Sequence, residues 1–262
     1  MKIEKVIFTI DDNPHYKAFW LSISRHFKTK MGMTPKLFII GDNVDANGYS
    51  TEFGEIEVVP KVPNVPTIIQ ALIGKFYFTK TELETTWLIG DLDLYPLQKY
   101  HFTEKIKDID DNGYVHLHPY AYGKNWRNGV NGLAGYFHIA KGKTFMEELK
   151  FERPFEDVVN EIFNSNRYGI KFHGQAASQV SIDASSDYGW FCCEEMYTGD
   201  KLKNCKKLIE TPPHNGYTRV DRSTMIYTID DIKSGKYIDF HAPRPYEKYK
   251  EVIEIIINEI AP

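Results

Sequence analysis

The sequence has 262 residues, of which 42% are hydrophobic and 14% aromatic, so one chain can bury a full core. Its 32 Lys and Arg residues against 36 Asp and Glu residues give a net charge of −4. This balance excludes the basic footprint expected of a protein that binds nucleic acid or an anionic membrane through bulk charge.

The first expected element is a short strand at residues 5–10. It is too short, and too soon followed by acidic residues, for a signal peptide, and no run approaches the ~20 apolar residues of a membrane span. We therefore expect a cytoplasmic protein. Asn13 can cap a following helix and Pro14 can occupy its first turn, with a stop at Gly32.

The loop after this strand, from Thr9 to Tyr16, is a candidate site for a nucleotide base, because open α/β sheets bind ligands beyond the carboxyl ends of their strands. Ordinary turn and capping residues explain the same loop equally well.

Two more strands are expected at residues 36–40 and 55–59, and then a helix at residues 68–76. Lys75 near the end of this helix is either a solvated lysine or a contact for a phosphate. The alternation of strands and helices predicts an α/β sheet in the first hundred residues.

An apolar strand at residues 87–89 is followed by Asp91 and Asp93, one residue apart, and then by Pro96. Two ionised carboxylates are costly to bury unless a cation or hydrogen-bond donors meet them. Mn²⁺ and Mg²⁺ prefer oxygen ligands and are often held by one or two carboxylates together with substrate phosphates. We therefore expect a divalent metal here, although a capping role remains an alternative.

The middle of the chain predicts strands at residues 114–119 and 133–140, separated by a polar, glycine-rich loop that carries Trp126 and Arg127. His116 and His118 share a face of the first strand, but further zinc ligands at a recognisable spacing are missing. Thr144 and Glu147 predict a capping box at the start of a helix. Pro154 is expected to interrupt this helix, which then continues after it.

A short helix at residues 190–197 carries the acidic pair Glu194 and Glu195. Cys192, Cys193 and Cys205 form neither a metal-binding spacing nor an even set, which indicates reduced thiols. The last third predicts strands at 225–229 and 237–241 and an amphipathic helix at 246–260.

In motif order the chain resembles a glycosyltransferase of the GT-A fold over most of its length. Four segments carry the likeness: the first strand and its loop at residues 7–16, Lys75, the Asp91-Leu92-Asp93 motif, and His241-Ala242-Pro243-Arg244-Pro245-Tyr246. The last segment is similar to the C-terminal motif of the glycogenin-like branch, although it is shorter and lacks the glycine of that motif.

The resemblance implies a single GT-A domain over residues 1–262, with a Rossmann-like mixed sheet flanked by helices. Residues 1–100 would form the nucleotide-sugar half and residues 101–262 the acceptor half. The implied donor is a nucleoside diphosphate sugar, with UDP favoured, and the implied acceptor is a glycan or another hydroxyl compound.

The resemblance also implies residue roles. The base, ribose and phosphates would be held by Thr9, Asp11, Asp12, Tyr16, Lys75, Asp91 and Arg244, and Mn²⁺ or Mg²⁺ by Asp91, Asp93 and His241.

The reaction itself would need a base only if the enzyme inverts the anomeric configuration. Glu194 and Glu195 resemble the acidic pair that many members carry at the start of an acceptor-side helix, with Asp183 and Asp187 next in line. A solvated helix face is the alternative for the glutamates. Trp126, Arg127 and Trp190 are expected to line the acceptor side.

Two other functions stay open at this stage. A phosphatase of the haloacid dehalogenase type would use Asp91 as its nucleophile, but its motif usually continues with Thr or Ser and stands nearer the N-terminus. A non-catalytic carbohydrate-binding module would use exposed aromatic residues such as Trp126, Tyr188 and Trp190.

Overall fold

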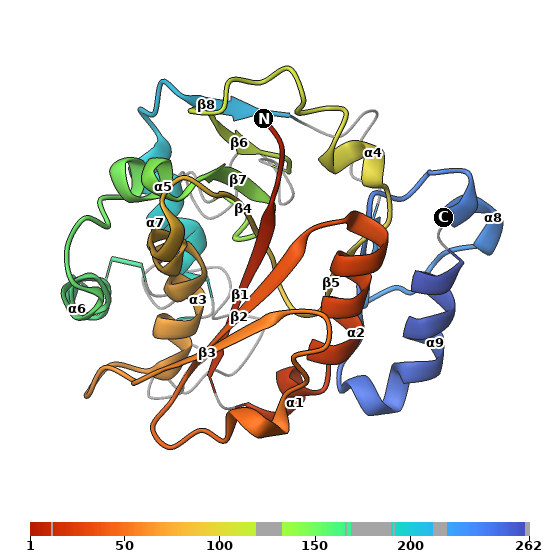
Figure 1. Cartoon of the computed structure of the whole chain (residues 1–262), viewed down its shortest axis with the longest axis horizontal. Coiled ribbons are helices and arrows are strands. Elements are labelled where there is room, and N and C mark those ends of the chain that lie inside the picture. The colour runs from red at the N-terminus through yellow and green to blue at the C-terminus, as the bar shows by residue number, and fades with distance from the viewer. Residues whose placement is uncertain are drawn as a thin grey trace.

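The computed structural model describes residues 1–11, 13–118, 133–165, 167–168, 190, 192–211 and 219–259. Its central sheet has seven strands in the order β3-β2-β1-β4-β7-β6-β8 (Figure 1). These strands are β1 Lys5–Asp11, β2 Thr34–Ile40, β3 Glu55–Val59, β4 Thr86–Ile89, β6 Tyr114–His116, β7 His138–Lys141 and β8 Leu208–Glu210. The smaller sheet, in the order β5-β10-β9, contains β5 Leu94–Pro96, β9 Arg219–Val220 and β10 Asp239–His241.

The helices lie between these strands in the sequence, except α9, which follows the last of them. They are α1 Pro14–Lys17, α2 Trp20–His26, α3 Thr67–Tyr77, α4 Lys99–Phe102, α5 Gly142–Leu149, α6 Phe155–Ser165, α7 Cys193–Leu202, α8 Ile229–Lys233 and α9 Tyr246–Asn258, with the π-helix η1 Phe27–Met31 and the 3-10 helices η2 Ala46–Gly48 and η3 Phe78–Glu82. No helix in the described ranges is long and apolar enough to cross a membrane.

Strands β1 to β4 run parallel, with β1 between β2 and β4, whereas β7 pairs antiparallel with β4. The carboxyl ends of four strands therefore meet at one edge of the sheet. This mixed α/β architecture confirms the predicted fold class.

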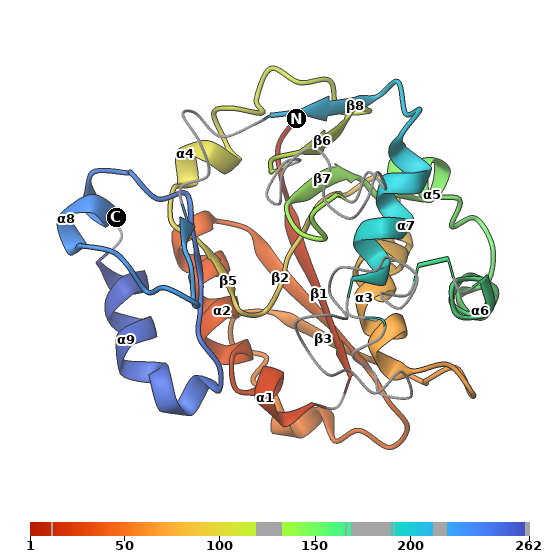
Figure 2. The ribbon, with the colours of Figure 1, turned by 180° about the vertical axis from the view of Figure 1, so that it is seen from behind.

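Both faces of the sheet are covered, as the alternation of side chains along β1 requires. Val6, Phe8 and Ile10 belong to one apolar cluster, which includes residues of α2 and α9, and Ile7 belongs to the other, which includes residues of α3, α5, α6 and α7. Figures 1 and 2 show these two groups of helices on opposite sides of the sheet.

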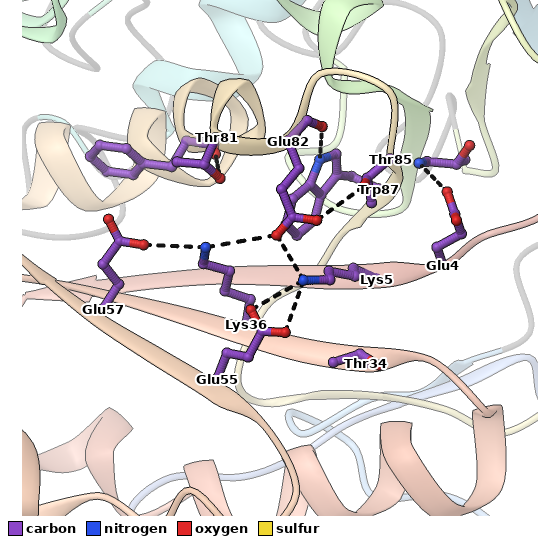
Figure 3. A network of polar contacts seen from close by, with 12 residues as sticks. Glu4, Lys5, Thr34, Lys36, Glu55, Glu57, Thr81, Glu82, Thr85 and Trp87 are labelled. Atoms are coloured by element: carbon purple, nitrogen blue, oxygen red, sulfur yellow. Dashed lines mark hydrogen bonds and ion pairs between the residues drawn. The ribbon is translucent and has the colours of Figure 1, made fainter.

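A charged network ties the strands together at the amino-terminal edge of the sheet (Figure 3). The amino group of Lys5 lies 2.8 Å from Glu55 and 2.7 Å from Glu82, and Lys36 lies 3.2 Å from Glu57. The carboxyl-terminal edge, where ligands bind in open α/β sheets, lies at the other ends of the same strands.

The small sheet attaches the C-terminal segment to the chain that follows β4. Strand β10 pairs antiparallel with β5, so His241 lies opposite Leu94. The amide of Ala242 also donates a hydrogen bond of 2.7 Å to the carbonyl of Asp93. Residues about 150 positions apart are thereby held side by side.

Three local predictions are wrong. The strand expected at 133–140 is limited to β7, because Phe137 has a positive φ of 57° and breaks the extended backbone. The helix expected at Thr144 begins earlier, at Gly142, without a side-chain cap. The strand expected at 225–229 is absent, since Thr228 accepts a hydrogen bond from the amide of Asp231 and starts α8.

Candidate active site

Asp91 and Asp93 follow β4 at the carboxyl-terminal edge, directly after Gly90, a position that leaves no room for a side chain. A Cβ atom at Gly90 would lie only 2.5 Å from the ring of Phe8 and 3.0 Å from Val6. The amide of Gly90 still bonds to the carbonyl of Ile7 at 3.0 Å, so the turn starts directly from the sheet. The two carboxylates therefore lie just beyond the carboxyl end of β4, which is the position expected from the sequence.

The carboxylate of Asp93 is buried beneath two guanidinium groups and an imidazole. Its Oδ2 lies 2.8 Å from Nη1 of Arg222 and 3.3 Å from Nε of Arg244. Nε2 of His241 is 3.6 Å from the same oxygen. Burial alone would raise the pKa of Asp93, but His241 and the two guanidinium groups hold it well below its usual value. Asp93 is therefore an anion at neutral pH.

His241 is held between two carboxylates, with Nδ1 lying 3.7 Å from Oδ2 of Asp221. Burial lowers the pKa of His241, and the neighbouring Asp93 and Asp221 outweigh burial and raise it. The contact with His241, opposed by burial, in turn lowers the pKa of Asp221.

The donor set at this point suits a divalent cation that shares its coordination with a substrate. Nε2 of His241 lies 3.6 Å from Oδ2 of Asp93, and a carboxylate can hold Mn²⁺ or Mg²⁺ together with phosphate oxygens. Among the described residues, no group of three His, Cys, Asp or Glu side chains could hold a metal without such help. Asp91 is directed elsewhere, with Oδ1 bonded to Lys75 at 2.7 Å.

Lys75 of α3 is buried and joins Asp91 to the acidic pair of α7. Its amino group lies 2.7 Å from Asp91 and 3.6 Å from Oε1 of Glu194. Burial lowers the pKa of Lys75, but Asp91 and Glu194 together raise it above its usual value. The alternative of a solvated lysine is wrong.

Glu194 and Glu195 are 4% and 6% exposed, so the alternative of a solvated helix face is also wrong. Burial, followed by the charge of Asp91, raises the pKa of Glu194, against the opposing effect of Lys75. Within the described part of the chain, Oε2 of Glu194 has no hydrogen-bond partner. A buried acceptor of this kind is suited to a hydroxyl group of a ligand.

Gly135 gives Glu194 the space that it occupies. A Cβ atom at residue 135 would lie 2.6 Å from Oε1 and 2.9 Å from Cγ of Glu194. The neighbouring carbonyl of Ala134 is fixed by the buried rings of His116, at 3.1 Å, and His138, at 2.7 Å. His116 and His138 therefore have a structural role, because they hold in place the loop that faces Glu194.

The predicted nucleotide loop leads to the same edge of the sheet. The hydroxyl of Thr9 donates to the carbonyl of Ala71 on α3, and Asp11 accepts a hydrogen bond of 3.0 Å from Thr67. Tyr16 of α1 accepts a hydrogen bond from Arg244, which also bonds to Asp93. Asp12 lies outside the described residues.

Burial, aided by the charge of Asp93, raises the pKa of Tyr16 to about 12. Its ring centre lies 5.1 Å from the guanidinium carbon of Arg244. Tyr16, Asp93 and Arg244, from three distant segments, therefore lie together at this edge of the sheet.

The acceptor-side predictions are less complete. Trp126, Arg127, Asp183, Asp187 and Tyr188 lie outside the described residues. Trp190 is buried, with its ring centre 5.6 Å from that of Phe163, so the expectation of an exposed aromatic at this position is wrong.

Sequence reasoning missed Asp221, Arg222 and Gly135. No periodicity or spacing marks them, and the first two reach Asp93 and His241 only through the pairing of β9 with β10.

No protein-family model and no curated protein matches the sequence. Solved structures do match. The apo structure of the bifunctional glycosyltransferase WbbM aligns with a TM-score of 0.51 and 10% identity over 98% of this chain and 50% of that chain. The galactosyltransferase LgtC, in complex with donor and acceptor sugar analogues, aligns with a TM-score of 0.50 and 10% identity over 98% of this chain and 96% of that chain.

This chain spans half the length of WbbM and nearly all of LgtC. Structural similarity at 10% sequence identity establishes the fold alone. The predicted GT-A type of architecture is thereby confirmed.

Proposed function

We propose that the protein is a glycosyltransferase that moves a hexosyl or pentosyl group from a UDP-sugar to a hydroxyl group of a glycan or glycoconjugate. One observation carries the proposal: Asp93, His241, Arg244 and Tyr16, from distant parts of the chain, converge at the carboxyl-terminal edge of the sheet. Ligands bind at this edge in open α/β folds. The shared fold with two glycosyltransferases supports the same assignment.

The charges of the site suit a diphosphate. The single carboxylate of Asp93 faces Arg222, Arg244 and His241. Guanidinium groups bind phosphate through paired, charge-assisted hydrogen bonds. In this proposal the nucleoside lies toward Tyr16 and Asp11, and the diphosphate lies over Asp93.

Asp93 and His241 would hold Mn²⁺ or Mg²⁺ together with the diphosphate, and Asp91 would face the ribose or the metal from beside them. The bound cation would neutralise the charge that develops on the leaving nucleoside diphosphate. Lys75 orients Asp91, since its amino group lies 2.7 Å from that carboxylate.

On the acceptor side, Glu194 and Glu195 are the proposed catalytic carboxylates. The Lys75 bridge places Glu194 next to the Asp91 side of the site, and its Oε2 is buried and able to accept a proton or hydrogen bond from a hydroxyl group. In this division of the domain, residues 1–100 bind the donor and residues 101–262 bind the acceptor, except that Arg222, His241 and Arg244 of the second half reach the diphosphate over Asp93.

A thermal-shift panel with Mn²⁺ and several nucleotides tests this function. UDP should stabilise the protein, by about 2.7 kcal/mol at a concentration 100 times its dissociation constant. UDP-sugar should then be consumed in the presence of an acceptor. Turnover of a generic phosphoester would instead indicate the phosphatase alternative, and indifference to every nucleotide would contradict the proposal.

A further inference from the structure

We infer that Arg222 is a second, exchangeable ligand for the diphosphate, which leaves Asp93 and binds the β-phosphate when the donor arrives. The inference rests on the proposed function, because it concerns the same site. Arg222 lies outside every segment that carried the family resemblance.

The first step is the number of donors and acceptors. Oδ2 of Asp93 is approached by Arg222 at 2.8 Å, Arg244 at 3.3 Å and His241 at 3.6 Å. One carboxylate carries one negative charge, whereas each guanidinium carries one positive charge and five N–H donors. Asp221, 3.7 Å from His241, offsets that imidazole, so the two guanidinium groups share the single negative charge of Asp93 and the excess positive charge faces an additional anion.

The second step is the direction in which that excess points. The side chain of Asp93 is 6% exposed, whereas the side chains of Arg222 and Arg244 are 32% and 34% exposed. The carboxylate is thus the buried side of this contact, and the guanidinium groups are its solvent-facing side. Within the described residues, Arg222 forms no hydrogen bond or ion pair except that with Asp93, so its remaining N–H groups are available to a ligand.

The third step separates the roles of the two arginines. Arg244 also donates to Tyr16, on the side where the nucleoside is proposed to lie. Arg222 lacks that bond and approaches Asp93 from the turn after β9. Arg244 is therefore assigned to the nucleoside side of the diphosphate, and Arg222 to the β-phosphate.

The turn that carries Arg222 is internally braced. The carbonyl of Asp221 accepts hydrogen bonds from the amides of Thr224 and Met225, at 3.2 and 2.8 Å, and its carboxylate accepts one from Ser223 at 2.8 Å. The backbone can therefore stay in place while the long side chain of Arg222 changes partner. No bond other than ion pairs and hydrogen bonds is exchanged.

The test is calorimetric binding of UDP and UMP, each with Mn²⁺, to the wild-type protein and to Arg222→Gln and Arg222→Lys. Loss of a charge-assisted contact to the β-phosphate should weaken UDP by about 10- to 100-fold and leave UMP nearly unchanged. Arg222→Lys, which keeps the charge, should retain part of the preference for UDP. Arg25→Gln is the matched control, since Arg25 also pairs with a carboxylate, that of Glu254 at 2.5 Å.

Equal losses of UDP and UMP affinity, or no loss of either, in Arg222→Gln would overturn the inference and leave Arg222 a structural partner of Asp93. Failure of the wild-type protein to bind UDP would instead contradict the proposed function. The two failures are therefore distinguishable in one set of titrations.

Discussion

Replacing Lys75 with methionine removes the cation that joins Asp91 to Glu194, and the structure indicates the cost. Lys75 and Glu194 are both buried, with their charged atoms 3.6 Å apart. At an effective dielectric constant of about 20, such a pair is worth about 4 to 5 kcal/mol, close to the ~3–5 kcal/mol lost when one partner of a buried pair is removed. The pair with Asp91 contributes less, because that carboxylate is 36% exposed.

The loss should depend on pH. Burial raises the pKa of Glu194, so the unfolded protein releases this proton at lower pH than the folded one, and the contribution of Glu194 to stability falls as pH rises through its folded pKa. Without Lys75 the pKa of Glu194 in the folded protein rises further. The stability of the variant therefore keeps falling as pH rises above the wild-type pKa of Glu194, where the stability of the wild-type protein has levelled off. The added loss is up to ~1.4 kcal/mol for each pH unit above the wild-type pKa of Glu194.

Urea denaturation at pH 5 and pH 8 measures this difference. We expect Lys75→Met to be less stable than the wild-type protein by ~1–2 kcal/mol at pH 5 and by up to ~2–3 kcal/mol at pH 8, because pH 8 lies about one unit above the Glu194 pKa of about 7. Adding Glu194→Gln should remove most of the pH dependence. Lys36→Met is the control, because Lys36 also pairs with two carboxylates but these are 45% and 32% exposed. Equal losses at both pH values would refute the reasoning.

The remaining predictions concern the acceptor side. Glu194→Gln should lower the transfer rate by ~10²–10⁴-fold with normal UDP binding, whereas Glu195→Gln should have only a small effect on the rate. The rates are measured by UDP release. Wild-type rates in both variants would show that this pair takes no part in catalysis. Gly135→Ala places a methyl group 2.6 Å from Oε1 of Glu194, so steady-state kinetics should show transfer reduced by ~10²-fold with UDP affinity retained. Unchanged kinetics in Gly135→Ala would show that the position of Glu194 does not matter.

Much of the donor side could be predicted because local pattern and site coincide there. The first three strands, the helix with Lys75 and the strand before Asp91 were expected within a few residues of their observed bounds. Buried parallel strands read as apolar runs, and charged groups at their carboxyl ends stand out against them. The convergence of His241 and Arg244 on Asp93 came from the family resemblance, since no local signal relates residues so far apart.

The errors have physical reasons that lie beyond single-residue patterns. The burial of Glu194 depends on Lys75 and on the space at Gly135, neither of which is visible from the α7 sequence. Arg222 follows a two-residue strand, which is too short to produce an alternating pattern. The apolar residues at 225–229 suggested a strand, but the positive φ of 49° at Met225 and the cap at Thr228 favoured a turn and a helix.

The central claim is that a nucleoside diphosphate binds over Asp93 with a divalent cation. Calorimetric titration of UDP into the wild-type protein and Asp93→Asn, each with Mn²⁺ and with a chelator, tests it directly. The account predicts that chelation weakens UDP binding to the wild-type protein by at least about 10-fold, since loss even of groups that support a metal ligand costs about 10- to 100-fold. Asp93→Asn should bind UDP weakly and equally with and without Mn²⁺. Undiminished, metal-dependent UDP binding by Asp93→Asn would contradict the account.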